Sequence, residues 1–157
     1  ADTLRAQWVY EFARPFLEMT KQSVTVDSMT AIWHGQAGAQ AMATGPVVIQ
    51  DTDLFSTVGY WQFPHWRDSL GSCPKRLIAE AQRYKSGLYI ITPSNIPFET
   101  DTLRTGGGVR EGSDEYWMMI CEQYHLNYVV LRSADRQERL HESLIYIRNI
   151  KEYLCAD

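Results

Sequence analysis

Two carboxylates and a hydroxyl follow a short apolar run in the middle third of the chain. Residues 47–50 read Val-Val-Ile-Gln after a Gly-Pro pair, and Asp51, Thr52 and Asp53 come directly after them. The run predicts a buried strand of a parallel sheet, and ligands of open α/β sheets bind at the carboxyl ends of strands. Carboxylates there can hold Mg²⁺, accept a proton from an attacking hydroxyl, or bind a sugar. The alternative is structural: Asp53 caps the next helix and Asp51 is a turn residue.

A glycine-rich segment from 93 to 112 carries the second group of candidates. Arg104 and Arg110 flank three consecutive glycines at 106–108. Guanidinium groups make bidentate, charge-assisted contacts with phosphate oxygens, and a segment this long without predicted structure is usually functional. We therefore expect a lid whose arginines close on phosphates; a solvated loop with incidental charge is the alternative. The 157 residues contain no G-x-x-x-x-G-K-[ST] motif, and hence no Walker A loop.

Charged and aromatic residues also follow the first predicted strand. Glu11 and Arg14 are three residues apart, so they can contact a substrate or pair with each other at a helix start. Tyr10 and Trp8 can stack on a planar heterocycle, although aromatic residues in strands usually belong to the core.

The remaining candidates carry weaker signals. Asp135 and Arg136 open the last predicted helix, where they border a nucleotide base or are an ordinary first-turn pair. The four histidines have no metal-binding spacing. Three widely spaced cysteines fit neither a disulfide framework nor a zinc site, and indicate a reducing compartment such as the cytoplasm.

Length and composition predict one soluble globular domain. The chain has 157 residues, of which 45% are hydrophobic and 22% charged. Its net charge of −4 argues against direct contact with nucleic acid, which needs a basic face. No apolar stretch approaches the roughly 20 residues of a membrane span.

Predicted strands alternate with predicted helices, which indicates a parallel α/β sheet flanked by helices. We expect strands at 6–10, 47–50, 88–92 and 128–131, and helices at 15–21, 28–44, 54–63, 74–85, 113–124 and 134–154. Asp27 is the expected N-cap of the second helix and Ser133 that of the last, and 64–74 is expected to be irregular. The last helix carries an apolar stripe formed by Leu140, Leu144, Ile147 and Ile150.

Four segments in chain order resemble one family. They are Glu-Phe-Ala-Arg at 11–14, Ile-Gln-Asp-Thr-Asp at 49–53, Asp-Thr-Leu-Arg-Thr-Gly at 101–106, and Asp-Arg at 135–136. Together they resemble the ribosylnicotinamide kinase domain of NadR-type proteins, over nearly the whole chain. The resemblance implies a P-loop kinase fold. It also implies transfer of the ATP γ-phosphate, with Mg²⁺, to the ribose 5′-hydroxyl of nicotinamide riboside, giving nicotinamide mononucleotide in NAD salvage.

The resemblance implies roles near the riboside for residues of three segments. Asp51 would lie near Mg²⁺ and the attacking hydroxyl, with Asp53 facing the riboside. Glu11 and Arg14 would contact the substrate, and Tyr10 would stack on nicotinamide. Gln36 would be a further substrate contact, on a helical segment, 35–41, without a counterpart to the family's second stacking aromatic.

Two further segments would act on the nucleotide. Arg104 and Arg110 would neutralise the charge of the transferring phosphoryl group, and Asp135 and Arg136 would lie near the adenine.

One departure concerns the part of the fold that binds phosphates. The family begins with a strand, a Walker A loop and a helix, and this sequence starts after them. In P-loop kinases that strand lies in the middle of the sheet, so its absence would leave two strand edges unpaired. We therefore expect residues 1–157 to be a C-terminal portion of a larger kinase that needs its N-terminal P-loop segment to use ATP. The alternatives are a kinase for another nucleoside or small metabolite, and a catalytically silent nucleoside-binding or regulatory module.

Overall fold

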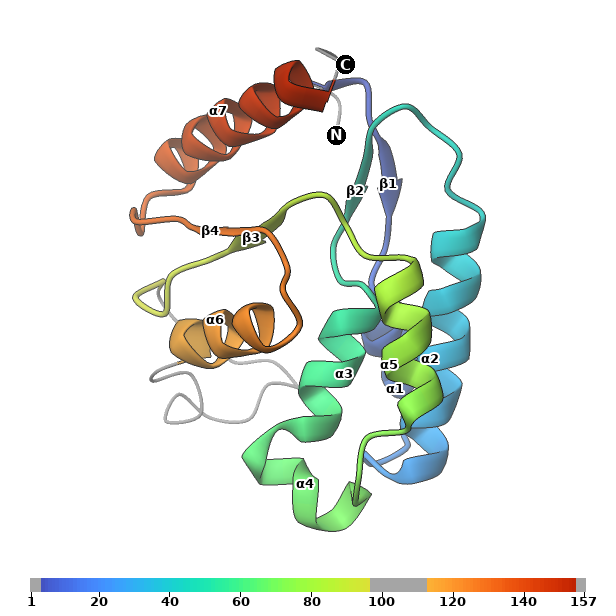
Figure 1. Cartoon of the computed structure of the whole chain (residues 1–157). Coiled ribbons are helices and arrows are strands. Elements are labelled where there is room, and N and C mark those ends of the chain that lie inside the picture. Colours follow the sequence, from blue (N-terminus) through green and yellow to red (C-terminus); the bar gives the residue numbers. More distant parts are fainter. Residues whose placement is uncertain (1–3, 97–112, 155–157) are drawn as a thin grey trace. The chain divides into compact units, whose positions relative to one another are not determined.

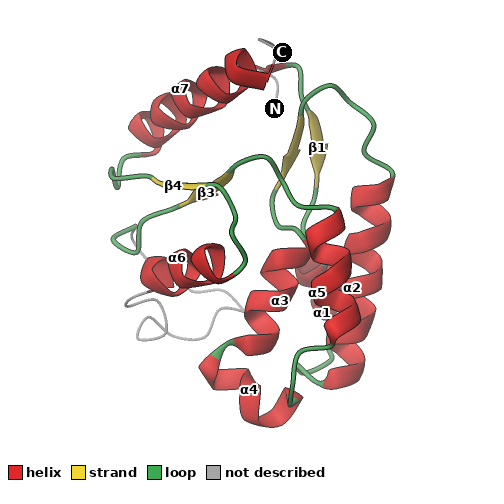
Figure 2. Cartoon of the chain, viewed as in Figure 1, coloured by secondary structure: helices red, strands yellow, loops and turns green. Residues whose placement is uncertain are grey.

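The computed structural model describes residues 4–96 and 113–154, and it divides into two compact units, Ala1–Lys85 and Ser86–Asp157 (Figure 1). The described residues form four short strands and seven helices, so the predicted α/β class is confirmed (Figure 2). The prediction that 1–157 is a portion of one kinase domain stays a prediction. Most of the expected lid, 97–112, lies outside the described residues, and Arg104 and Arg110 lie there with it.

The first unit contains one pair of strands and five helices. Its elements are β1 (Gln7–Val9), α1 (Ala13–Thr20), α2 (Val26–Ala41), β2 (Val48–Gln50), α3 (Leu54–Gln62), α4 (Pro64–Leu70) and α5 (Lys75–Arg83). The strands run parallel, with Gln7 opposite Val48 and Val9 opposite Gln50. Helix α3 packs against α2, α4 and α5, and α1 packs against α2 (Figure 1).

The core of this unit is centred on α3. Four of its apolar side chains are at most 2% exposed: Leu54, Phe55, Val58 and Trp61. Leu77 and Ala81 of α5 are buried beside them, and Met29, Ile32 and Trp33 line the buried face of α2. A hydrogen bond from Trp33 Nε1 to Glu80 Oε2 (2.8 Å) joins α2 to α5. Burial on this scale is the main source of stability in a small domain.

The second unit contains β3 (Tyr89–Ile91), α6 (Ser113–Gln123), β4 (Tyr128–Val130) and α7 (Arg136–Leu154). The strands are again parallel, with Tyr89 opposite Tyr128, and α6 packs against both of them. Its buried apolar side chains are Ile91, Ile120, Cys121, Leu126 and Leu131.

Helix α7 has no buried side chain among its described residues. In the predicted apolar stripe, Leu140 is 50% exposed and the other three members are half-buried. The amphipathic pattern is therefore present, but in these residues it is only partly covered.

The four predicted strands are all present and parallel, but they form two separate pairs rather than one sheet. In the part of the chain that the structure describes, each strand has a neighbour along one edge. Side-by-side strands in parallel sheets are normally paired along both edges and covered on both faces. The expectation that a central strand comes from another segment stays a prediction.

Three local predictions are wrong. Thr25, not Asp27, is the N-cap of α2, where its side chain accepts the Ser28 N–H (3.2 Å). Segment 64–74 is not wholly irregular, because Pro64 starts the short helix α4 at a position where its missing N–H is not needed. The cap of α7 is Asp135 rather than Ser133, since Asp135 Oδ1 accepts the N–H groups of the second and third helical residues (2.8 and 2.9 Å).

No helix in residues 4–96 and 113–154 combines the length and the apolar content that crossing a membrane requires.

Candidate functional site

Two segments meet at the carboxyl ends of the first strand pair. Tyr10, Glu11 and Phe12 follow β1, and Asp51 to Asp53 follow β2. The Asp51 N–H donates to the Val9 carbonyl (3.0 Å), which extends the ladder one residue beyond β2. Because parallel strands end at the same edge, the residues that follow β1 and those that follow β2 lie next to each other.

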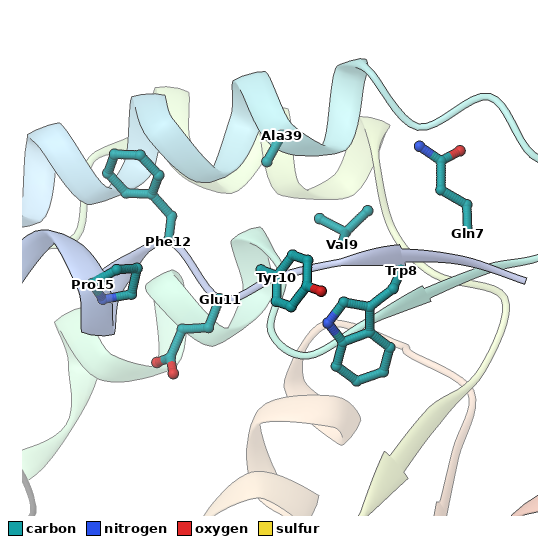
Figure 3. A pocket seen from close by; sticks show the side chains of 8 residues that line it. All are labelled: Gln7, Trp8, Val9, Tyr10, Glu11, Phe12, Pro15 and Ala39. Carbon is teal, nitrogen blue, oxygen red and sulfur yellow. The ribbon is translucent and has the colours of Figure 1, made fainter. Parts of the chain in front are cut away.

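A pocket of about 310 Å³ lies along β1 (Figure 3). It is lined by residues of β1 and the segment that follows, with one residue of α1 and one of α2: Gln7, Trp8, Val9, Tyr10, Glu11, Phe12, Pro15 and Ala39. Val9 and Phe12 point toward α2, and Trp8 points to the opposite side of the strand (Figure 3). We call this the β1 pocket. It contains two of the predicted substrate contacts, Tyr10 and Glu11.

Tyr10 offers an open aromatic surface at this pocket. Its side chain is 75% exposed, and its ring meets the ring of Trp8 edge to face, with centroids 6.1 Å apart. The expectation that strand aromatics belong to the core does not hold for Tyr10. An exposed ring of this kind can stack on a planar ligand.

Glu11 and Arg14 form the pair that their spacing predicted. Arg14 Nε lies 3.7 Å from Glu11 Oε2, and Arg14 Nη1 lies 3.8 Å from Glu18 Oε1. The Arg14 and Glu11 side chains are 35% and 25% exposed, so water screens the pair and its contribution to stability is small. Their predicted contact with a substrate stays a prediction.

The two aspartates after β2 have different surroundings. Asp53 is 4% exposed, its Oδ1 accepts the Ser56 N–H (3.0 Å), and the Ser56 hydroxyl accepts the Asp53 N–H (3.4 Å). This reciprocal capping box starts α3, so the helix-cap alternative is confirmed for Asp53. Asp51 is exposed at the strand end. Neither aspartate lines the β1 pocket.

Asp51 fits a magnesium ion only as one ligand among several. Within residues 4–96 and 113–154, no group of three or more acidic, histidine or cysteine side chains is arranged to hold a metal. Mg²⁺ bound together with a nucleotide needs one or two carboxylates, with phosphates and water completing its octahedron. The exposed carboxylate of Asp51 meets that requirement, whereas the Asp53 carboxylate already caps a helix.

The side-chain amide of Gln36 is hydrogen-bonded to backbone groups at both of its ends. The residue is 1% exposed; its Oε1 accepts the Phe12 N–H (3.0 Å) and its Nε2 donates to the Thr52 carbonyl (2.8 Å). Gln40, one turn later, accepts the Leu54 N–H (2.9 Å) and donates to the Tyr84 carbonyl (3.3 Å). Gln40 was not among the residues that the sequence indicated as candidates. The available signal was the spacing of four residues, which puts both amides on one face of α2.

Asp135 and Arg136 belong to the second unit, at the start of α7, and both are exposed. Asp135 caps the helix, as its alternative role as an ordinary residue of a helix start suggested. Their predicted role near the adenine is untested.

Comparison with protein-family models matches residues 1–139 to the family described as the AAA domain. The chain belongs to the AAA domain family. Its fold is therefore that of a P-loop NTPase-like, nucleotide-binding domain, which confirms the sequence resemblance at this coarser level. ATP and Mg²⁺ are consistent with such a domain. No curated protein matches the chain.

Proposed function

We propose that this AAA domain forms the nucleoside side of a cytoplasmic kinase that phosphorylates the ribose 5′-hydroxyl of nicotinamide riboside, giving nicotinamide mononucleotide. The observation that carries the proposal is the β1 pocket, where the exposed ring of Tyr10 and the carboxylate of Glu11 line one cavity. The pyridinium ring of nicotinamide riboside is planar and positively charged. It can stack on Tyr10 with cation–π attraction, and Glu11 adds a complementary charge.

In this proposal Asp51 acts on the attacking hydroxyl. A bond forms between the ribose 5′-oxygen and the γ-phosphorus of ATP, the bond from that phosphorus to the β,γ-bridging oxygen breaks, and ADP leaves. Asp51 accepts the proton of the 5′-hydroxyl, which suits an exposed carboxylate at a strand end. Mg²⁺, when bound, would neutralise charge on the phosphates, with Asp51 as one ligand.

The remaining roles rest on the sequence. The phosphoryl group is neutralised by Arg104 and Arg110. The adenine is bordered by Asp135 and Arg136. The riboside is also contacted by Arg14 and Asp53. Asp53 would act from its capping position, which leaves it little freedom to move.

The phosphate-binding segment comes, in this proposal, from outside residues 1–157. Two features support it. The sequence contains no Walker A motif, and in the described residues β2 and β3 belong to different two-stranded sheets. An added strand carrying a Walker A loop would pair with strand edges that now have no neighbour in those residues.

Nucleoside binding tests the substrate directly. Nicotinamide riboside should bind the chain in calorimetry. Adenosine, uridine and thymidine should bind with dissociation constants at least about ten-fold higher. Phosphorylation should require protein that includes the Walker A segment. If nicotinamide riboside fails to bind, the assignment is wrong; binding without turnover in the longer protein would identify a silent nucleoside-binding module instead.

The two aspartates provide a matched pair of variants for the catalytic role. Asp51→Asn should lower turnover by about two or more orders of magnitude, because it removes a carboxylate without changing shape. Asp53→Asn should lower turnover much less, since asparagine is an equally good N-cap and Asp53 takes no part in the proton transfer; any loss there should be in riboside affinity. Survival of turnover in Asp51→Asn within a few-fold would exclude Asp51 as base or metal partner.

A second candidate is a kinase for another nucleoside. The observation that favours it is on α2, where segment 35–41 has no aromatic residue and both ends of the Gln36 amide are bound to backbone. A nucleoside base stacked on Tyr10 would therefore have no second aromatic partner from segment 35–41 of this helix. Tighter binding of another nucleoside in the same panel would select this candidate.

A further inference from the structure

Gln36 stands between the two segments that carry the candidate residues. Its amide bonds to the backbone of Phe12 on one side and of Thr52 on the other. Phe12 directly follows Glu11, and Thr52 directly follows Asp51. One buried side chain thus joins the chain positions next to the proposed nucleoside contact and the proposed base.

The segment after β1 is held at both of its ends. The Val9 carbonyl accepts the Asp51 N–H (3.0 Å), and the Phe12 N–H is held by Gln36. Only Tyr10 and Glu11 lie between these anchors. The backbone of the two pocket residues is therefore determined by one strand bond and one side-chain bond.

The side chain of Phe12 is held as well as its backbone. Its ring packs on Gly35 so closely that a Cβ added there would overlap the ring, and it stacks on Phe16 with centroids 5.7 Å apart. Gly35 and Gln36 are neighbours on α2. This helix therefore makes two contacts with Phe12: one with its ring through Gly35 and one with its backbone N–H through Gln36.

We propose that Gln36 is a positioning residue, whose amide sets the separation of the Tyr10–Glu11 backbone from that of Asp51. A glutamine suits the task because one amide carries both an acceptor and a donor, so it can bond the N–H of one segment and the carbonyl of the other. A buried backbone group left without its partner is costly, and this cost favours a rearrangement of the segment that carries it. The effect on ligand binding rests on the proposed function; the effect on the backbone does not.

Gln40 supplies a matched control. It lies on the same face of α2, is 8% exposed and makes the same number of backbone bonds, but its partners are Leu54 and Tyr84. Methionine has a similar length and no hydrogen-bonding amide, so Gln36→Met and Gln40→Met each remove two bonds. A general loss of packing would affect both variants alike, whereas loss of positioning would affect only the first.

The test combines amide signals with affinity. In Gln36→Met we expect the amide signals of Tyr10 and Glu11 to shift, exchange of the Phe12 amide to accelerate about ten-fold or more, and affinity for nicotinamide riboside to fall about ten-fold. In Gln40→Met these amides should be unchanged, because its partners Leu54 and Tyr84 lie outside the Tyr10–Glu11 segment, and any fall in affinity should be smaller than in Gln36→Met. If Gln36→Met does not fold, Gln36→Asn replaces it, because the shorter amide cannot span both partners.

Unchanged signals at Tyr10 and Glu11 in the Gln36 variant, or equal changes in both variants, would overturn the inference. If the parent chain does not bind nicotinamide riboside, the proposed function fails. The amide signals then decide the positioning role by themselves.

Discussion

The two units differ in how completely they bury their apolar residues. In the unit Ala1–Lys85, α3 is surrounded by other helices, and side chains such as Val58 and Leu77 are fully buried. In the unit Ser86–Asp157, the longest helix buries none of its described side chains. The first unit therefore surrounds a central helix with apolar contacts, whereas the apolar stripe of α7 in the second stays partly exposed among the described residues.

Two leucines, one in each unit, should give the largest contrast. Leu77 is 0% exposed, so Leu77→Ala should lower the unfolding free energy by about 2–5 kcal/mol. Leu140 is 50% exposed, and Leu140→Ala should change it by less than about 0.5 kcal/mol. Urea titrations of both variants measure the difference. A loss above about 2 kcal/mol in Leu140→Ala would mean that α7 is covered in solution.

Cys73 lies in the connection between α4 and α5. Its thiol tests how far this part of the first unit excludes water. Burial raises the pKa of Cys73 from 9.0 to about 11. At pH 8 its alkylation should therefore be about 100-fold slower than in the urea-unfolded chain, as mass spectrometry of the labelled peptide measures. Equal rates in the folded and unfolded chain would show that water reaches the Cys73 thiol freely in the folded protein.

The same shift has a consequence for stability. The unfolded chain releases this proton near pH 9 and the folded chain near pH 11. The unfolding free energy should therefore fall as pH rises from about 9 to about 11, and Cys73→Ser should remove that part of the dependence.

Two glycines of α2 test the close packing within the first unit. Gly35→Ala should lower the unfolding free energy by about 1–3 kcal/mol, because the new methyl group would overlap the Phe12 ring. A Cβ at Gly38 meets nothing within 4 Å, so Gly38→Ala should raise it by up to about 1 kcal/mol through helix propensity. Thermal unfolding of both variants provides the comparison, and a neutral Gly35→Ala would show that Phe12 moves freely.

The helix caps should give the smallest contrast between the units. Asp53 and Asp135 cap α3 and α7, but only Asp53 is buried. Asp53→Ala should cost about 1–2 kcal/mol and Asp135→Ala about 0.5–1 kcal/mol. Circular dichroism during denaturation measures both, and a reversed order would indicate that burial does not strengthen the cap.

Much of the fold could be predicted because its signals are local. The strands and most helices were located within a few residues by apolar runs such as 47–50 and by Gly, Pro and Ser residues at the ends of the elements. The errors were also local: Thr25 and Asp27 are both good caps, and the reciprocal hydrogen bonds between Thr25 and Ser28 decide in favour of Thr25. The division into two strand pairs depends on which strands become neighbours, which composition does not encode.

The site could be predicted in part. The pairing of Glu11 with Arg14 and the meeting of the two strand-end segments follow from spacing and parallel topology. The burial of Gln36 could not be predicted, because a glutamine among small residues is equally suited to water, a ligand or backbone groups. Its role depends on Phe12 and Thr52, which are 24 and 16 residues away.

The glutamine pair of α2 also bears on how tolerance to substitution should be read in this chain. A library of random variants selected only for folding would place positions 36 and 40 with the apolar core, since both side chains are buried like those of the core leucines. Polar character there would be mistaken for a sign of catalysis. Reading such data correctly therefore requires asking whether an intolerant amide serves its own main chain or a bound molecule.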